Sequence, residues 1–189
     1  MKKILLILLL SVVAFGLTAV SPKKAKKVKL QDCFEPILRW PIEIPANFSL
    51  EKFYKDTGDV FLYFNRDILK GAFDPSAPLY TGREHAFIYR LKCDLRSEQC
   101  LEFISKQKGS MPNAHRLFII WAQLEGNVEP EDESFIFGLD YEKNLWLSNY
   151  GCRQVVFVSK NMYGKWVSNI ACFEDGVPKG SYIVFTRKK

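Results

Sequence analysis

The sequence is poor in the side chains that most enzymes and metal sites need. Histidine occurs only twice among 189 residues, as His85 and His115. The chain has no C-x-x-C pair, no glycine-rich phosphate loop, no nucleophile elbow and no H-E-x-x-H motif, which are patterns that carry zinc, redox, phosphate and hydrolase chemistry. Isolated histidines usually have structural roles. The sequence therefore predicts a protein without a catalytic site, a metal site or a cofactor.

Positive charge is also scarce outside the N-terminus. The formal net charge is +6, but seven of the 27 basic residues are lysines within the first 30 positions, where no acidic residue occurs. The remaining 20 basic residues are balanced by 21 acidic ones. A body with almost no net charge argues against nucleic acid as a partner. The lysine cluster KKAKKVK in residues 23–29 is expected to be a solvated arm or to contact anionic lipid or glycan.

The N-terminus has the layout of a secretory signal peptide. Two lysines precede an apolar run from Ile4 to Val13, and small residues follow it, as in signal peptides. Cleavage fits after Gly16 or, less well, after Ala19. The apolar stretch continues to Val20, which is close to the shortest span that crosses a bilayer. An uncleaved anchor is therefore the alternative.

These features divide the chain into three parts. We assign residues 1–19 to the signal peptide, residues 20–32 to a basic flexible arm and residues 33–189 to a single β-rich domain, which is long enough to bury one core. Five cysteines fit export, because thiols are oxidised to disulfides on the secretory route. Their odd number leaves at least one thiol free or bound to another chain. We expect a secreted, extracellular protein without a stable membrane span after signal cleavage.

Most of the domain reads as short strands separated by turns. Eight segments are rich in aromatic and β-branched residues, as strands are: 60–64, 85–93, 100–106, 134–139, 144–150, 153–160, 165–173 and 181–188. Ser49 is a plausible N-cap for a short helix over 49–56, in which Leu50, Phe53 and Tyr54 share a face. Residues 113–125 fit either a helix or a buried strand. The neighbouring strands favour a strand there.

Two stretches resemble the lipocalins. FGLDYEKNLWLSNYGC, residues 137–152, is similar to the second conserved motif of that family, in which a turn with Asp and Tyr joins two late strands. Residues 31–61 look like a lipocalin beginning, with an early cysteine, an Asn-Phe pair, a short helix and a glycine before the first strand. The resemblance implies a mainly β fold: an antiparallel meander that closes into a barrel, with a short N-terminal helix. A different secreted β-sandwich or barrel, or an α+β arrangement, is the alternative.

The sequence leaves the disulfide pairing open. Alternation along strands places Cys152 and Cys172 on the same face of a late hairpin. Similarity to lipocalins implies instead a bond between Cys33 and Cys152. We prefer this second pairing, because it closes the longer loop and so constrains the unfolded chain more. If both predicted strands turn their apolar sides inward, Cys93 and Cys100 point apart.

A lipocalin-like barrel predicts a binding protein that carries or sequesters a small hydrophobic or amphipathic ligand. The candidate lining residues are aromatic: Phe87, Tyr89, Phe103, Trp121, Trp146 and Phe157. If these side chains form an ordinary core, the alternative is a disulfide-stabilised β-domain that recognises a protein or a glycan with its surface. A cavity large enough for a ligand favours the first hypothesis, and a filled core favours the second.

The signal layout makes a prediction about the mature chain. We expect the exported protein to begin after Gly16 or Ala19, because signal peptidase cleaves after small residues that follow the apolar run. N-terminal sequencing of protein collected outside the producing cells measures this directly. A chain that still begins at Met1 would contradict the assignment.

Overall fold

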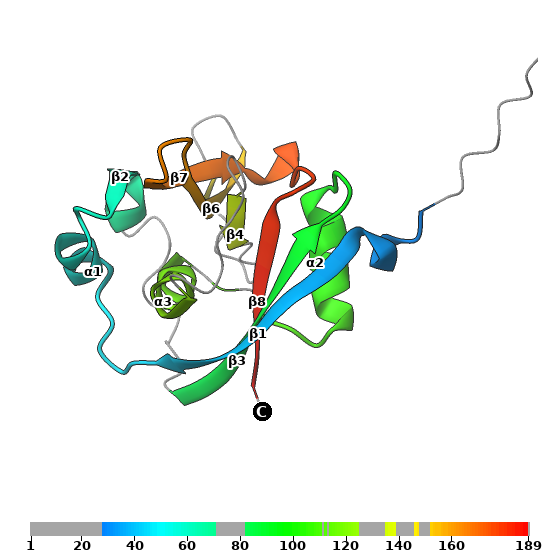
Figure 1. Cartoon of the computed structure of the whole chain (residues 1–189), viewed down its shortest axis with the longest axis horizontal. Coiled ribbons are helices and arrows are strands. Elements are labelled where there is room, and N and C mark those ends of the chain that lie inside the picture. Colours follow the sequence, from blue (N-terminus) through cyan, green and yellow to red (C-terminus); the bar gives the residue numbers. More distant parts are fainter. Residues whose placement is uncertain are drawn as a thin grey trace, which may run out of the picture.

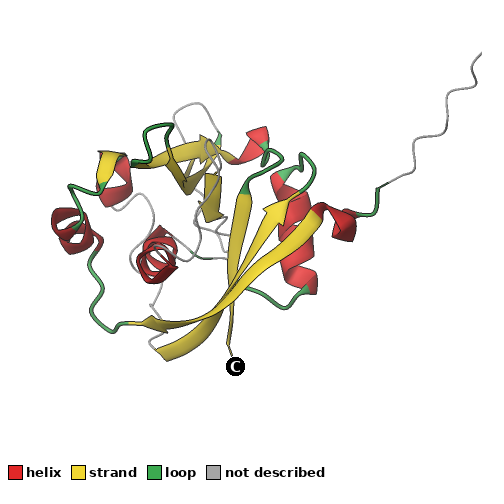
Figure 2. Cartoon of the chain, viewed as in Figure 1, coloured by secondary structure: helices red, strands yellow, loops and turns green. Residues whose placement is uncertain are grey.

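The structure is a computed structural model, and it describes residues 28–70, 82–110, 112, 114–124, 135–138, 146–147 and 152–188. Within these ranges the chain forms one mixed sheet with helices on both faces (Figures 1 and 2). The predicted signal peptide and residues 20–27 of the predicted arm lie outside the described residues.

The strands of the sheet come from the whole length of the domain. They are β1 (Phe34–Ile44), β2 (Phe61–Phe64), β3 (Gly82–Leu91), β4 (Phe135–Gly138), β5 (Trp146–Leu147), β6 (Arg153–Lys160), β7 (Trp166–Cys172) and β8 (Tyr182–Lys188). Their order is β1-β3-β8-β4-β6-β7-β2, and β5 pairs with β6. Two pairs are parallel, β4 with β8 and β2 with β7, and the others are antiparallel.

The mainly β class is confirmed, but the described strands do not close into the predicted barrel. The sheet stays open, because its outer strands β1 and β2 lie at opposite ends of the strand order. A simple meander contains only antiparallel neighbours. The two parallel pairs bring together strands that are distant in the sequence, and the local strand pattern contains no signal for such pairs.

Helices cover both faces of this sheet. The α-helices are α1 (Leu50–Asp56), α2 (Ser97–Lys106) and α3 (Ala114–Leu124), and the short 3-10 helices are η1 (Leu30–Cys33), η2 (Arg66–Lys70) and η3 (Phe173–Asp175). In Figure 1, α1 and α3 lie on one side of the sheet and α2 lies on the other. We call these sides the α3 face and the α2 face. The predicted short helix is α1, and the Ser49 hydroxyl caps it by accepting a hydrogen bond from the Lys52 amide at 3.2 Å.

Alternation along the strands builds a separate core on each face. In β6, Val156 and Val158 belong to the core on the α3 face, whereas Val155 and Phe157 belong to or pack against the core on the α2 face. Successive side chains of a strand point to opposite faces. Because both faces are covered, both sets of side chains are apolar, and the central strands are continuous hydrophobic runs.

The predicted strand at 100–106 is wrong, since these residues form most of α2. Cys100, Phe103 and Ile104 are buried, and their spacing of three and four residues places them on one side of a helix. The Arg96 amide donates to the Gln99 side chain at 3.0 Å at the start of the helix. The aromatic and β-branched composition of the segment concealed this helical spacing.

The preference for a strand within 113–125 is also wrong, because residues 114–124 form α3. The helix lies in the core on the α3 face, and five consecutive residues from Leu117 to Trp121 are buried. A helix enclosed on nearly every side has too small a polar stripe to reveal its period. At its start, Arg116 forms a buried ion pair with Glu84 of β3 at 3.3 Å.

The predicted bond between Cys33 and Cys152 is wrong. The disulfides are Cys33–Cys93 and Cys152–Cys172, so the pairing derived from strand alternation is confirmed for the second bond. The first bond depends on β1, a strand that the sequence did not predict. Its two prolines are tolerated because β1 is an edge strand. β1 runs antiparallel to β3 with Phe34 opposite Leu91, which brings Cys33 beside Cys93.

Gly176 provides a test of one close backbone approach in this fold. Its φ is +78°, and a Cβ there would lie 2.6 Å from the Leu95 carbonyl oxygen. Gly180 also has a positive φ of +87° but has no atom within 4 Å of such a Cβ. We expect Gly176→Ala to lower the unfolding free energy by at least about 1 kcal/mol more than Gly180→Ala, because the two backbones must separate. Chemical denaturation measures both, and equal losses would contradict the close approach.

Candidate ligand-binding cleft

A short segment after η3 is hydrogen-bonded to the chain that follows β3. Leu95 and Val177 exchange two backbone hydrogen bonds, of 3.0 and 2.8 Å. The Lys179 amide donates to the Asp94 carboxylate at 2.7 Å. These bonds hold residues 176–179 along the start of α2, and the small size of Gly176 permits the close approach. The segment therefore forms a fixed wall beside the α2 face of the sheet.

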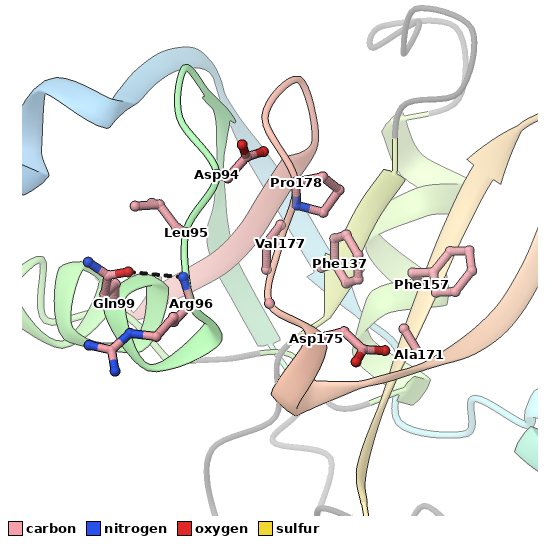
Figure 3. Close-up of a pocket in the computed structure, with 11 residues that line it drawn as sticks. Asp94, Leu95, Arg96, Gln99, Phe137, Phe157, Ala171, Asp175, Val177 and Pro178 are labelled. Atoms are coloured by element: carbon pink, nitrogen blue, oxygen red, sulfur yellow. Dashed lines mark hydrogen bonds between the residues drawn. The ribbon is translucent and has the colours of Figure 1, made fainter.

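An open cleft of about 640 Å³ lies next to this wall. Its lining residues come from three places. These are the chain just before α2 with its first turn, the end of η3 with the segment after it, and strands β4, β6 and β7: Asp94, Leu95, Arg96, Gln99, Phe137, Phe157, Ala171, Asp175, Gly176, Val177 and Pro178. Figure 3 shows Phe137, Phe157 and Ala171 together on one side of the segment, with Leu95, Arg96 and Gln99 on the other side. The volume lies in the range usual for small-molecule sites.

The floor of the cleft is apolar and its rim is charged. Phe137 and Phe157 are register partners on β4 and β6, and their ring centroids are 5.7 Å apart. Phe157 and Ala171 are half-buried, whereas Asp94, Arg96 and Asp175 are exposed. Side chains of both charges thus surround an aromatic surface that solvent reaches.

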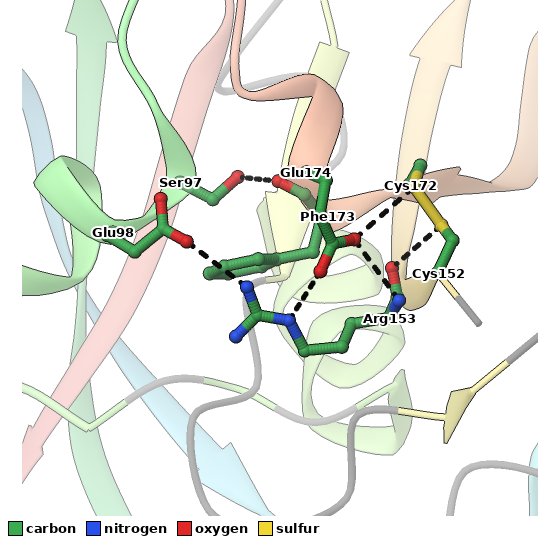
Figure 4. Close-up of polar contacts among 7 residues, drawn as sticks. All are labelled: Ser97, Glu98, Cys152, Arg153, Cys172, Phe173 and Glu174. Carbon is green, nitrogen blue, oxygen red and sulfur yellow. Dashed lines mark hydrogen bonds and ion pairs between the residues drawn. A yellow bond between two sulfur atoms is a disulfide. The ribbon is translucent and has the colours of Figure 1, made fainter.

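A polar cluster fixes the position of η3, which contributes to the cleft (Figure 4). Arg153 Nε donates to Glu174 at 2.6 Å, and another of its nitrogens donates to Glu98 of α2 at 3.1 Å. The Arg153 guanidinium also lies 4.2 Å from the ring centroid of Phe173. The Ser97 hydroxyl donates to the Phe173 carbonyl at 2.7 Å. The cluster joins β6, α2 and η3.

The ion pair with Arg153 makes the Glu174 carboxyl a stronger acid. Hydrogen bonds from Arg153 hold the pKa of the Glu174 carboxyl below its usual value.

Cys152 and Cys172 lie beside Glu174, and their sulfur atoms and a carboxylate oxygen are close enough together to surround a metal ion. Their sulfur atoms are joined in a disulfide, however, and the thiolate form is the one that binds metal. The cluster is therefore a structural brace in the oxidised protein.

The residues predicted to line a ligand cavity are distributed over both faces of the sheet. Phe157 lines the cleft. Phe87, Tyr89 and Phe103 lie on the same face of the sheet, in or against the core beneath α2, where the Tyr89 and Phe103 ring centroids are 5.1 Å apart. The backbone of Trp146 belongs to β5, and its side chain lies outside the described part of the structure.

Trp121 belongs to the core on the other face. The cavity beside it, between α3 and the sheet, has a volume of about 20 Å³, which is room for one water molecule. This space is far smaller than a ligand site. The side chains of α3 and the sheet therefore fill the space around Trp121.

Sequence reasoning missed most of the cleft. Phe137 and Ala171 lie in strands that it predicted, and alternation would have placed them on one face with Phe157 once the pairing of β4, β6 and β7 was known. Leu95 and Val177 lie in connections between predicted elements. No short motif marks them, because long-range backbone pairing brings them together.

Among the described residues, the two histidines lie on different elements and the free cysteine is buried. Ala86 of β3 belongs to the core on the α3 face, so the side chain of its neighbour His85 points to the α2 face. His115 belongs to α3, on the other side of the sheet. Burial lowers the pKa of His115 below its usual value, and its ring lies edge-on to Phe48. Cys100 is free and fully buried, and burial raises the pKa of its thiol to about 12. Such a thiol is protonated at neutral pH and is not a nucleophile.

No family model matches the chain, and no significant similarity to a curated protein or a solved structure is found. The resemblance to lipocalins therefore stays a prediction from the sequence. Among the described helices, none is both long and apolar enough to cross a bilayer.

The burial of Cys100 predicts how the protein reacts with alkylating agents. With four of the five cysteines in disulfides, we expect iodoacetamide to modify no thiol of the folded protein at neutral pH and one thiol after unfolding without reductant. Peptide mass mapping identifies the modified residue. Rapid labelling of the folded protein, or labelling of a cysteine other than Cys100, would contradict the assignment.

Proposed function

We propose that this chain is an exported, non-enzymatic protein that binds a small amphipathic molecule in the cleft beside Phe137 and Phe157. The observation that carries the proposal is the cleft itself, about 640 Å³ of space over an apolar floor. Half-buried aromatic surface in a concave site loses its contact with water when a ligand covers it, and this favours binding.

The residues that line the cleft determine which class of ligand it can bind. The floor accepts an aliphatic or aromatic group, while Asp94, Asp175 and Arg96 at the rim can hydrogen-bond to a polar end. Small-molecule sites are typically apolar with a few polar groups that fix orientation. The resemblance to lipocalins supports the same ligand class. The location differs, since the cleft lies on the open α2 face and not inside a closed barrel.

The cysteines support export. Two disulfides join distant or opposed parts of the chain, Cys33 to Cys93 and Cys152 to Cys172, and such bonds persist in oxidising compartments outside the cytosol. Together with the signal layout at the N-terminus, they favour a secreted, extracellular protein. The buried, protonated thiol of Cys100 and the separation of the two histidines support a binding role without catalysis.

Filling the cleft with a large side chain tests the site. We expect the wild-type protein to bind the fluorescent amphiphile N-phenyl-1-naphthylamine saturably, with enhanced emission. Ala171→Trp places an indole in the cleft and should weaken this binding at least about tenfold. Ala122→Trp, at an exposed position on α3, makes the same substitution away from the cleft and should leave the dissociation constant unchanged.

Two controls separate binding from folding. Circular dichroism and melting temperature must show that both tryptophan variants retain the wild-type fold. Equal affinity in all three proteins, or no saturable binding to the wild type, would refute the cleft as the site and leave surface recognition of a protein or glycan as the better account.

A further inference from the structure

The turn between β6 and β7 presents the two most exposed large apolar side chains of the described protein. Met162 is 69 % exposed and Tyr163 is 79 % exposed. A single exposed hydrophobic residue is common on a protein surface and needs no explanation. Met162 and Tyr163 are adjacent and together give the tip of this hairpin an apolar surface.

The turn is held in one conformation by its own hydrogen bonds. The Asn161 side-chain oxygen accepts from the amides of Tyr163 and Lys165, at 3.0 and 2.9 Å. The Asn161 amide donates to the Lys165 carbonyl at 2.9 Å, and Gly164 permits the turn with a φ of +69°. A turn that is already ordered loses little conformational entropy when its side chains become buried in a complex. Met162 and Tyr163 are therefore displayed on a rigid support.

Edge strand β2 adds two more exposed apolar side chains at the same end of the sheet. Leu62 is 65 % exposed and Tyr63 is 50 % exposed. β2 lies parallel to β7 with Phe61 opposite Trp166, so its beginning is beside the strand that leaves the turn (Figure 1). Among the described residues, the other large hydrophobic side chains that are exposed, Val28 and Ile37, belong to the region of η1 and β1 at the opposite edge.

The charges beside the turn indicate which apolar partner fits. Lys160 and Lys165 flank it in the sequence, and the Lys160 ammonium lies 5.3 Å from the ring centroid of Trp166. Asp59, two residues before β2, is an acidic residue close in sequence to Leu62 and Tyr63. Lysines are attracted to the negative surface of an anionic membrane, and apolar and aromatic side chains can enter its interface.

We propose that the turn at Met162 and Tyr163, together with Leu62 and Tyr63, docks shallowly onto an anionic lipid surface. A projecting turn suits a fluid bilayer interface, because lipids rearrange around it, whereas a protein partner would need a complementary groove. Tyrosine is enriched at the headgroup level of membranes. The proposal does not depend on the cleft, which lies at the Cys172 end of β7, whereas the turn lies at the Trp166 end.

Vesicle binding by the mature chain tests the proposal. We expect the protein to sediment with phosphatidylcholine vesicles that contain phosphatidylglycerol and to be released by salt. The double variant Met162→Ser, Tyr163→Ser should bind at least about tenfold more weakly, because it removes the inserted apolar surface. The control variant Ile37→Ser removes exposed apolar surface from β1 at the opposite edge and should bind as the wild type does.

Two further measurements test separately the contribution of lysine charge and the insertion of the turn into the lipid surface. Lys165→Gln should weaken binding to the anionic vesicles about fivefold, because the attraction of one lysine to an anionic membrane surface changes the dissociation constant by about this factor. The melting temperature should stay unchanged. An environment-sensitive dye on Met162→Cys should brighten and shift to the blue when anionic vesicles are added, and the same dye on Ile37→Cys should not. Selective labelling is feasible because Cys100 is buried and the other cysteines form disulfides.

Three results would overturn the proposal. The first is a wild-type protein that stays in solution with anionic vesicles at low salt. The second is a Met162→Ser, Tyr163→Ser variant that binds as tightly as the wild type. The third is binding without any change in the dye on Met162→Cys, which would show that a different surface touches the lipid.

Discussion

The constraint on which the rest of this structure depends is that its central strands are apolar on both faces. A sheet of this kind must be covered on both sides, because each exposed apolar face would cost free energy in water. α1 and α3 cover one face and α2 covers the other (Figure 2). Closing the sheet into a barrel would leave one of the two apolar faces outside, exposed to water. The double covering therefore accounts for an open sheet with two cores.

The candidate cleft follows from incomplete coverage of the α2 face. α2 packs on the β1, β3 and β8 part of the sheet, where Phe103 stacks on Phe34 with centroids 3.7 Å apart. Beyond it, Phe157 and Ala171 stay half-buried. The hydrogen bonds between Leu95 and Val177 and the Arg153 cluster hold the wall in place. A rigid wall beside the partly exposed ring of Phe157 is a preformed site, which costs little reorganisation when a ligand binds.

The two disulfides link segments that the sheet brings side by side. Cys33–Cys93 joins η1 to the end of β3, at the edge strand β1 that contains two prolines. Cys152–Cys172 joins the start of β6 to the end of β7, beside the Arg153 cluster. Constraining these ends lowers the entropy of the unfolded chain. The apolar turn at Met162 lies at the far end of the same hairpin, so its position is set by a well-braced pair of strands.

The sequence by itself determined the β-rich class, the short helix capped by Ser49 and the strands from β2 to β8, because period-two alternation, β-branched content and caps are local signals. It also determined that Cys152 and Cys172 share a face. Only the tertiary structure decided that residues 100–106 and 114–124 are helices, that β1 pairs with β3 and therefore Cys33 with Cys93, and that Phe157 meets Val177 and Ala171 at a cleft. These features depend on parallel and long-range pairings between strands, and on burial that hides a helix's polar stripe. The strand pairings leave no mark in the spacing of neighbouring residues, since a strand's partner is selected by the packing of the whole sheet. In α2 the helical spacing of Cys100, Phe103 and Ile104 was present, but the strand-like composition was given more weight.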